Sequence, residues 1–136
     1  MLDRTATCAC GRVQISLRGE PEAVGACNCT QCQKRTGSAF GLGSYFKKTQ
    51  VLNIQGPHKA FTRSSDAGRD IETHFCTECG STVFWYAAFR PEHIGVAVGC
   101  FADPDFVAPT RASWTSHKLK WVTFPPSMAQ IERQSG

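Results

Sequence analysis

The chain has 136 residues, of which 41% are hydrophobic and 19% charged, so it can bury one core and leaves little room for two domains. Its formal net charge is +4. No run approaches the roughly 18 apolar residues that span a bilayer, and residues 1–5 lack the apolar stretch of a secretory signal. These properties argue against a membrane protein, a coiled coil and a disordered chain, and they predict one cytoplasmic domain over residues 1–136.

Short strands dominate the expected secondary structure. Val13, Ile15 and Leu17 alternate with polar residues, which predicts a half-buried strand. A helix is expected only at 30–35, with Thr30 as its N-cap. Later strands are expected at 40–46, bulged by two glycines, and at 51–54, 58–63, 71–75, 83–86 and 93–98. Four prolines make the C-terminal third irregular, so the pattern predicts a mainly β domain with little helix.

Seven of the eight cysteines fall into three tight clusters, and Cys100 stands alone. The clusters are Cys8-x-Cys10, Cys27-x-Cys29-x-x-Cys32 and Cys76-x-x-Cys79. Sulfurs one or two residues apart face the same side of a tight turn, which suits a tetrahedral metal ion with sulfur at ~2.3 Å. Disulfide scaffolds usually spread their cysteines along the chain, so this spacing favours metal ligation over disulfides.

Glycines indicate which clusters share an ion. Gly11 follows the second sulfur of the first cluster and Gly80 follows the second sulfur of the last, so each chain can turn there with positive φ. These two clusters are predicted to form one closed four-sulfur site. The middle cluster offers three sulfurs, as in sites with an open position, unless a further side chain closes it. Candidates for that fourth ligand are Cys100, His74, His93 and Glu78.

The chemistry of a three-thiolate site can be anticipated. Three thiolates leave Zn²⁺ with a local charge of about −1, a weak Lewis acid that suits a bound thiol better than a hydrolytic water. If the helix at 30–35 forms, Cys29 and Cys32 lie at its N-terminus, where the helix dipole favours thiolates. The hypothesis is that a small thiol enters the fourth position.

Other side chains have two interpretations each. Lys34 and Arg35 can hold a substrate carboxylate or be ordinary exposed bases, and His74 can carry a proton or be a half-buried strand residue. Cys100 is most simply a small buried residue, while Trp85 and Tyr86 suit either the core or a pocket wall. The basic residues are scattered, and seven thiolates with two zinc ions reduce the net charge to about +1, so nucleic acid is not expected as a partner.

Taken together, the motifs resemble the glutathione-dependent formaldehyde-activating enzyme family, which also includes centromere protein V. The resemblance is carried by Cys8-Ala9-Cys10-Gly11, by Cys27 to Ser38, by Phe75 to Gly80, and by the stretch from Trp114 to Trp121. It implies a β-tent fold with two zinc ions per chain. A structural zinc would lie on Cys8, Cys10, Cys76 and Cys79, and a second, catalytic zinc on Cys27, Cys29 and Cys32.

The resemblance also implies an activity. Members of the family add glutathione to formaldehyde, giving S-(hydroxymethyl)glutathione, and are classed as carbon–sulfur lyases. The alternative is a non-catalytic zinc-binding module for a protein partner, because a scaffold does not guarantee an active site. The incomplete three-sulfur set favours the enzyme and small-molecule partners, a thiol and an aldehyde. The sequence leaves the particular thiol and aldehyde and the oligomeric state open.

Overall fold

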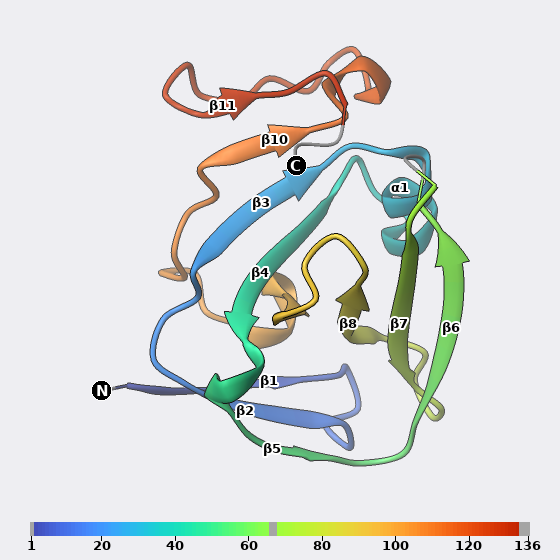
Figure 1. Cartoon of the computed structure of the whole chain (residues 1–136), viewed down its shortest axis with the longest axis vertical. Helices are drawn as coiled ribbons and strands as arrows, with labels where there is room; N and C mark the ends of the chain where they lie inside the picture. Colours follow the sequence, from blue (N-terminus) through green and yellow to red (C-terminus); the bar gives the residue numbers. More distant parts are fainter. Residues whose placement is uncertain (1, 66–67, 134–136) are drawn as a thin grey trace.

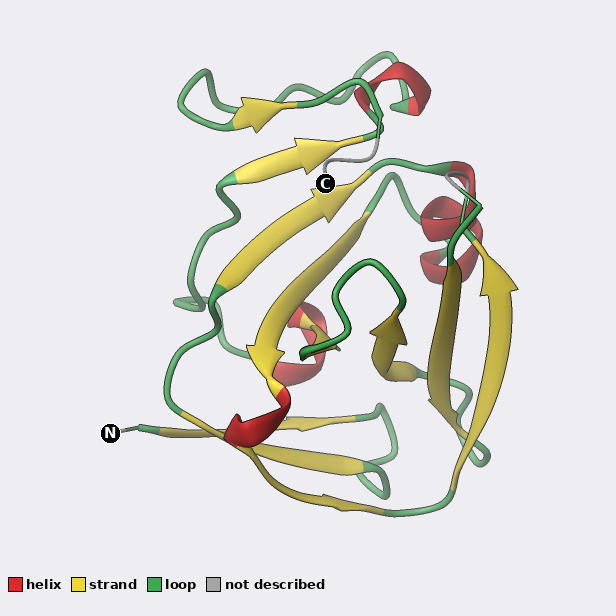
Figure 2. Ribbon diagram, in the orientation of Figure 1, coloured by secondary structure: helices red, strands yellow, loops and turns green. Residues whose placement is uncertain are grey.

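The computed structural model describes residues 2–65 and 68–133 and consists mainly of β-strands in two sheets (Figures 1 and 2). The first sheet has the order β1-β2-β5, with β1 Asp3–Thr7, β2 Gln14–Arg18 and β5 Val51–Gln55. The second has the order β11-β10-β3-β4-β9-β8-β7-β6. Its strands are β3 Ala23–Cys27, β4 Gly41–Lys47, β6 His58–Ser64, β7 Asp70–Cys76, β8 Thr82–Ala87, β9 His93–Ala97, β10 Arg111–Ser113 and β11 Ala129–Gln130. The predicted mainly β architecture is confirmed.

Helical structure is short. The helix α1 covers Thr30–Thr36, and three single turns of 3-10 helix cover Lys48–Gln50, Val98–Phe101 and Thr115–His117. Figure 1 shows the three-stranded sheet at the bottom of the molecule and α1 in the upper half, below β10 and β11. Within residues 2–65 and 68–133, no helix combines the length and the apolar character needed to cross a bilayer.

The core lies between the two sheets and follows the predicted alternation. Val13, Ile15 and Leu17 are fully buried, whereas Gln14 and Ser16 between them are partly exposed. They pack with aromatic and branched residues of the larger sheet, including Phe46, Phe84, Ile94 and Val96. Apolar burial of this kind is the main favourable term in folding, at about 25 cal/mol per Å².

Two sequence-based expectations were wrong. No bulge is found in β4, which pairs with β3 and β9 in unbroken register. Its glycines instead make space, since a Cβ would lie 2.6 Å from Arg35 Nη2 at Gly41 and 2.8 Å from Trp85 Cζ2 at Gly43. The N-cap of α1 is Cys29 rather than Thr30, because the Cys29 sulfur accepts the hydrogen bond of the Cys32 amide.

One glycine lets the chain cross between the sheets. Gly56, which joins β5 to β6, has φ of 103°, and a Cβ there would lie 2.0 Å from the Arg12 carbonyl oxygen. The next residue, Pro57, accepts a hydrogen bond from the Thr77 amide at 3.1 Å. This crossover therefore contacts the chain beside both outer cysteine clusters.

Candidate metal centres

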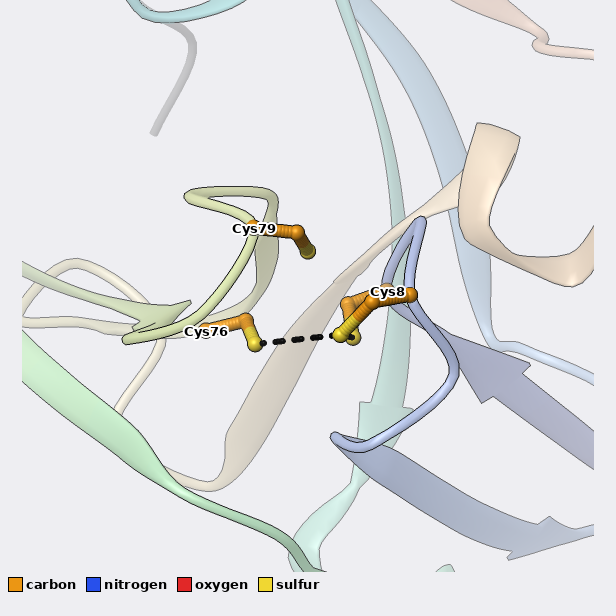
Figure 3. A group of neighbouring side chains, drawn as sticks. Cys8, Cys76 and Cys79 are labelled. Carbon is orange, nitrogen blue, oxygen red and sulfur yellow. Dashed lines mark hydrogen bonds between the residues drawn. The ribbon is translucent and has the colours of Figure 1, made fainter.

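The outer cysteine clusters meet in space. Figure 3 shows Cys8, Cys76 and Cys79 pointing toward one another from the turn after β1 and the turn between β7 and β8. With Cys10 they form a group whose sulfurs all lie within 4.8 Å of one another. The Cys8–Cys10 and Cys10–Cys76 sulfur distances are 3.6 and 3.7 Å. Tetrahedral ligation with zinc–sulfur bonds of ~2.3 Å places sulfurs about 3.8 Å apart, so the group fits such an ion.

The two turns are built alike. The Cys8 amide donates to the Val13 carbonyl at 3.0 Å, and the Cys76 amide donates to the Ser81 carbonyl at 2.9 Å. Each turn is closed by a glycine of positive φ, 82° at Gly11 and 80° at Gly80. Those conformations suit glycine because they carry no Cβ penalty. The predicted matching of the first and last clusters is therefore supported by their local geometry.

The surroundings of the four sulfurs shift the pKa values of their thiols in different directions. The Ser81 hydroxyl, 3.3 Å from Cys79 Sγ, is the main cause that lowers the pKa of Cys79 to about 5. The Arg12 amide lowers the pKa of Cys10, but partial desolvation and the three neighbouring cysteines outweigh it and raise that pKa to about 11. Four negative sulfurs this close repel one another, so a bound dication is what allows all four to be deprotonated.

The middle cluster is local in sequence and lies at the opposite end of the molecule (Figure 1). Cys27 ends β3, Cys29 caps α1, and Cys32 lies in the first turn of that helix. Their sulfurs also lie within 4.8 Å of one another. The intervening Asn28 is fully buried, and its side-chain amide donates to the Ser113 carbonyl at 2.9 Å. This bond fixes the loop that presents the first two sulfurs.

The three sulfurs share protons unequally when no cation is present. Donation from Cys29 and Cys32 lowers the pKa of Cys27 to about 3. The Cys27 thiolate in turn raises the pKa of Cys29, and Cys27 together with Cys29 raises the pKa of Cys32. One thiolate is thus favoured and a second and third are costly, so this donor set also fits a divalent, sulfur-preferring ion.

None of the four candidate side chains joins the middle cluster as a fourth ligand in the described part of the chain. Each has another neighbour: Cys100 Sγ lies 3.7 Å from the Thr82 carbonyl, His74 bonds Glu72 at 2.7 Å, His93 bonds Glu22 at 3.1 Å, and Glu78 lies 3.6 Å from Arg12. Cys100 packs against the core, and burial raises its pKa to about 11. The three-sulfur group therefore has room for an external ligand.

The three sulfurs open into a cavity of about 110 Å³. Its described lining contains four arginines, at positions 35, 63, 90 and 111, and no aspartate or glutamate. Aromatic walls come from Tyr45, Trp85, Phe89 and Trp114. A cavity with thiolates on one part of its wall and several cations elsewhere is suited to a sulfur-containing anion.

Two of the arginines are stacked on aromatic rings. The Arg35 guanidinium carbon lies 4.8 Å from the Trp85 ring centroid, and that of Arg90 lies 4.8 Å from the Tyr45 centroid. Trp85 Nε1 donates to the Tyr45 hydroxyl at 3.3 Å, which links the two stacks. Trp85 itself requires Gly95, where a Cβ would lie 2.1 Å from Nε1. Burial raises the pKa of Tyr45, and the Cys32 and Cys27 charges add to that effect.

The structure separates residues that the sequence left ambiguous. Arg35 lines the cavity, whereas Lys34 is exposed and does not. Trp85 forms a cavity wall, whereas Tyr86 packs against His74 and Phe84 outside it. Sequence reasoning missed Tyr45, Arg63, Arg90 and Arg111, because they lie on separate elements and match no local motif.

The comparisons with known proteins agree with these features. A family model described as glutathione-dependent formaldehyde-activating enzyme matches residues 3–117. A curated relative from Fusarium vanettenii, named a putative glutathione-dependent formaldehyde-activating enzyme, is 29% identical over 86 residues. The matched region is 63% of this chain and only 44% of that relative. A crystal structure of a Rhodobacter sphaeroides protein has the same fold, with a TM-score of 0.56, 18% identity, and coverage of 93% of this chain and 98% of that one.

Proposed function

Since the chain belongs to the glutathione-dependent formaldehyde-activating enzyme family, we propose that it is a zinc-dependent enzyme of the carbon–sulfur lyase type. It adds a small thiol such as glutathione to an aldehyde such as formaldehyde, giving S-(hydroxymethyl)glutathione or a related adduct. The observation that carries this proposal is the three-sulfur group that opens into an arginine-lined cavity. A module that only binds a protein partner needs neither feature.

The two sulfur groups divide the metal between structure and chemistry. Cys8, Cys10, Cys76 and Cys79 would hold one zinc ion, and Cys27, Cys29 and Cys32 would hold the other. When bound to three thiolates, zinc lowers the pKa of an incoming thiol and keeps its sulfur deprotonated. The arginines nearby attract the anionic thiol and fix its position, while Trp85 and Trp114 limit access of water to the sulfur.

The addition also needs a proton. A bond forms between the thiolate sulfur and the aldehyde carbon, the carbonyl electron pair moves onto oxygen, and that oxygen must be stabilised and then protonated. The Tyr45 hydroxyl lines the cavity and accepts a hydrogen bond from Trp85 Nε1. Its own proton therefore remains available to donate to a substrate oxygen. Tyr45 is therefore the proposed donor to the developing oxyanion.

Exchange spectroscopy tests the reaction. NMR magnetisation exchange between glutathione and S-(hydroxymethyl)glutathione is measured with formaldehyde and the zinc-loaded protein. We expect the protein to accelerate exchange, Cys32→Ser to abolish the acceleration, and Cys100→Ser to retain it, because Cys100 lies outside both sulfur groups. An exchange rate that the wild-type protein leaves unchanged would remove formaldehyde and glutathione as substrates.

A further inference from the structure

Three arginines of the cavity are half-buried without a carboxylate partner. Arg35, Arg63 and Arg90 all line the cavity and are partly buried. None of them takes part in an ion pair within residues 2–65 and 68–133. In the described part of the chain, Arg63 donates to the Ser64 backbone oxygen at 3.3 Å. Partial removal of a charge from water is unfavourable unless an opposite charge compensates it.

Arg4 shows how the same protein treats a half-buried arginine elsewhere. Its guanidinium carbon lies 4.7 Å from the Phe106 ring centroid, so it is stacked like Arg35 and Arg90. Unlike them, it is neutralised by Glu20 at 2.9 Å and Asp103 at 3.4 Å. The cavity arginines therefore lack the carboxylates that Arg4 has. The three sulfurs that share their cavity would carry a net charge of only about −1 with zinc bound, which leaves an excess of positive charge for an anionic ligand.

The stacking leaves the guanidinium groups ready to bind such an anion. A guanidinium that lies on a ring uses its face, while its N–H donors remain in its plane and match a carboxylate in pairs. Arg35 on Trp85 and Arg90 on Tyr45 are both held this way. For an ammonium group the cavity offers no carboxylate, because no aspartate or glutamate is among the described residues that line it.

Building on the proposed function, we propose that Arg35, Arg63 and Arg90 bind the carboxylates of the thiol substrate. The cavity then selects thiols that carry at least two acidic groups and makes no use of an amino group. Glutathione satisfies this rule through its two carboxylates. An analogue that lacks the amino group satisfies it equally well, so the substrate class is defined by acidic groups beside a thiol rather than by a peptide.

Calorimetric titration of the zinc-loaded wild-type protein tests the rule with four thiols. These are 2-mercaptoethanol, glutathione, glutathione with both carboxylates esterified, and glutathione with its amino group replaced by hydrogen. We expect the diester to bind at least about tenfold more weakly than glutathione, because charge-assisted hydrogen bonds are lost. We expect the deaminated analogue to bind within about twofold of glutathione, or more tightly.

Variants on one strand identify the groups responsible. Arg63→Gln should weaken glutathione binding about tenfold and leave 2-mercaptoethanol unchanged, while Arg63→Lys should retain part of the affinity. Lys59→Gln removes the same charge from β6 at an exposed residue outside the cavity lining, and it should have no effect. The zinc content and melting temperature of each variant show whether it is folded, and the ligand series on the wild type needs no variant.

Each outcome has one meaning. Equal binding of glutathione and its diester, or loss of binding by the deaminated analogue, overturns the acidic-group rule while the proposed function stands. If 2-mercaptoethanol binds no better than a thiol-free alcohol and glutathione does not bind, the thiol-binding function itself fails, and this inference fails with it.

Discussion

The two sulfur groups are built from the same residue type and yet differ in nearly everything around them. The four-sulfur group joins turns 66 residues apart, between Cys10 and Cys76, and holds two strand pairs together. The three-sulfur group lies within six residues of one segment and opens into a cavity with four arginines. The difference shows that the number of cysteines matters less than where the chain brings them from. Under the proposed function, the distant cysteines would hold the fold together, whereas the adjacent ones at the cavity wall would leave a coordination position to a ligand.

Removing a ligand of the four-sulfur group should have the largest effect. Cys79→Ser removes one ligand from the four-sulfur group, and we expect insoluble or unfolded protein. Structural zinc sites contribute about 10–16 kcal/mol, as much as the whole stability of a typical domain. Circular dichroism and the melting temperature measure the result. A soluble Cys79→Ser protein with an unchanged melting temperature would show that the four-sulfur group is not structural.

Removing a ligand of the three-sulfur group should leave the fold intact. Cys27→Ser should bind one zinc per chain instead of two, lose activity by more than about 100-fold, and melt within a few degrees of wild type. The reason is that the middle cluster is local in sequence and joins no distant strands, so the hydrophobic core can hold the fold without it. Metal analysis of purified protein gives the count. Unfolding as complete as that of Cys79→Ser would remove the distinction between the two groups.

A subtler change should move one arginine without touching a sulfur. In Gly41→Ala the new Cβ would meet Arg35 Nη2 at 2.6 Å, and the flexible arginine must leave its place on Trp85. We expect glutathione affinity to fall about three- to tenfold while the zinc content stays at two. Gly99→Ala is the matched control, since its Cβ meets no atom within 4 Å. Equal affinities of the two variants would show that Arg35 has no part in binding.

The smallest expected effect is a change in the free energy of unfolding at alkaline pH. Burial raises the pKa of Tyr45 above its ordinary value, so the folded protein keeps this proton to higher pH than the unfolded chain. Above about pH 10 the free energy of unfolding should therefore fall with rising pH, and it should fall less in Tyr45→Phe. Urea titrations between pH 9 and pH 11 measure the slopes. Parallel slopes would place the Tyr45 hydroxyl in a solvated setting.

The sequence predicted the features that are local. Alternation gave the buried face of β2, and the glycines after Cys10 and Cys79 indicated the shared four-sulfur group, because both signals arise within a few residues. It did not predict β1, which is short and polar, or β3, whose residues are mostly small. It also misread the β4 glycines as a bulge, since their reason is the close approach of Arg35 and Trp85 from elsewhere in the chain.

The cavity was beyond the reach of sequence patterns for a similar reason. Arg35 follows directly from a cysteine motif and could be singled out as a substrate contact. Arg63 and Arg90 come from β6 and from the loop after β8, and each resembles an ordinary surface base until the sheet places it beside the three sulfurs. Only the pairing of β7 with β6 and β8 creates that neighbourhood.

The loop closed between Cys10 and Cys76 contains the whole middle cluster. During synthesis the four-sulfur group is complete only after Cys79, the seventh cysteine, has been added, whereas the three sulfurs of the middle cluster are present from Cys32 onward. When zinc is scarce, a cell would accumulate folded but inactive protein, with zinc in the four-sulfur site and none in the three-sulfur site.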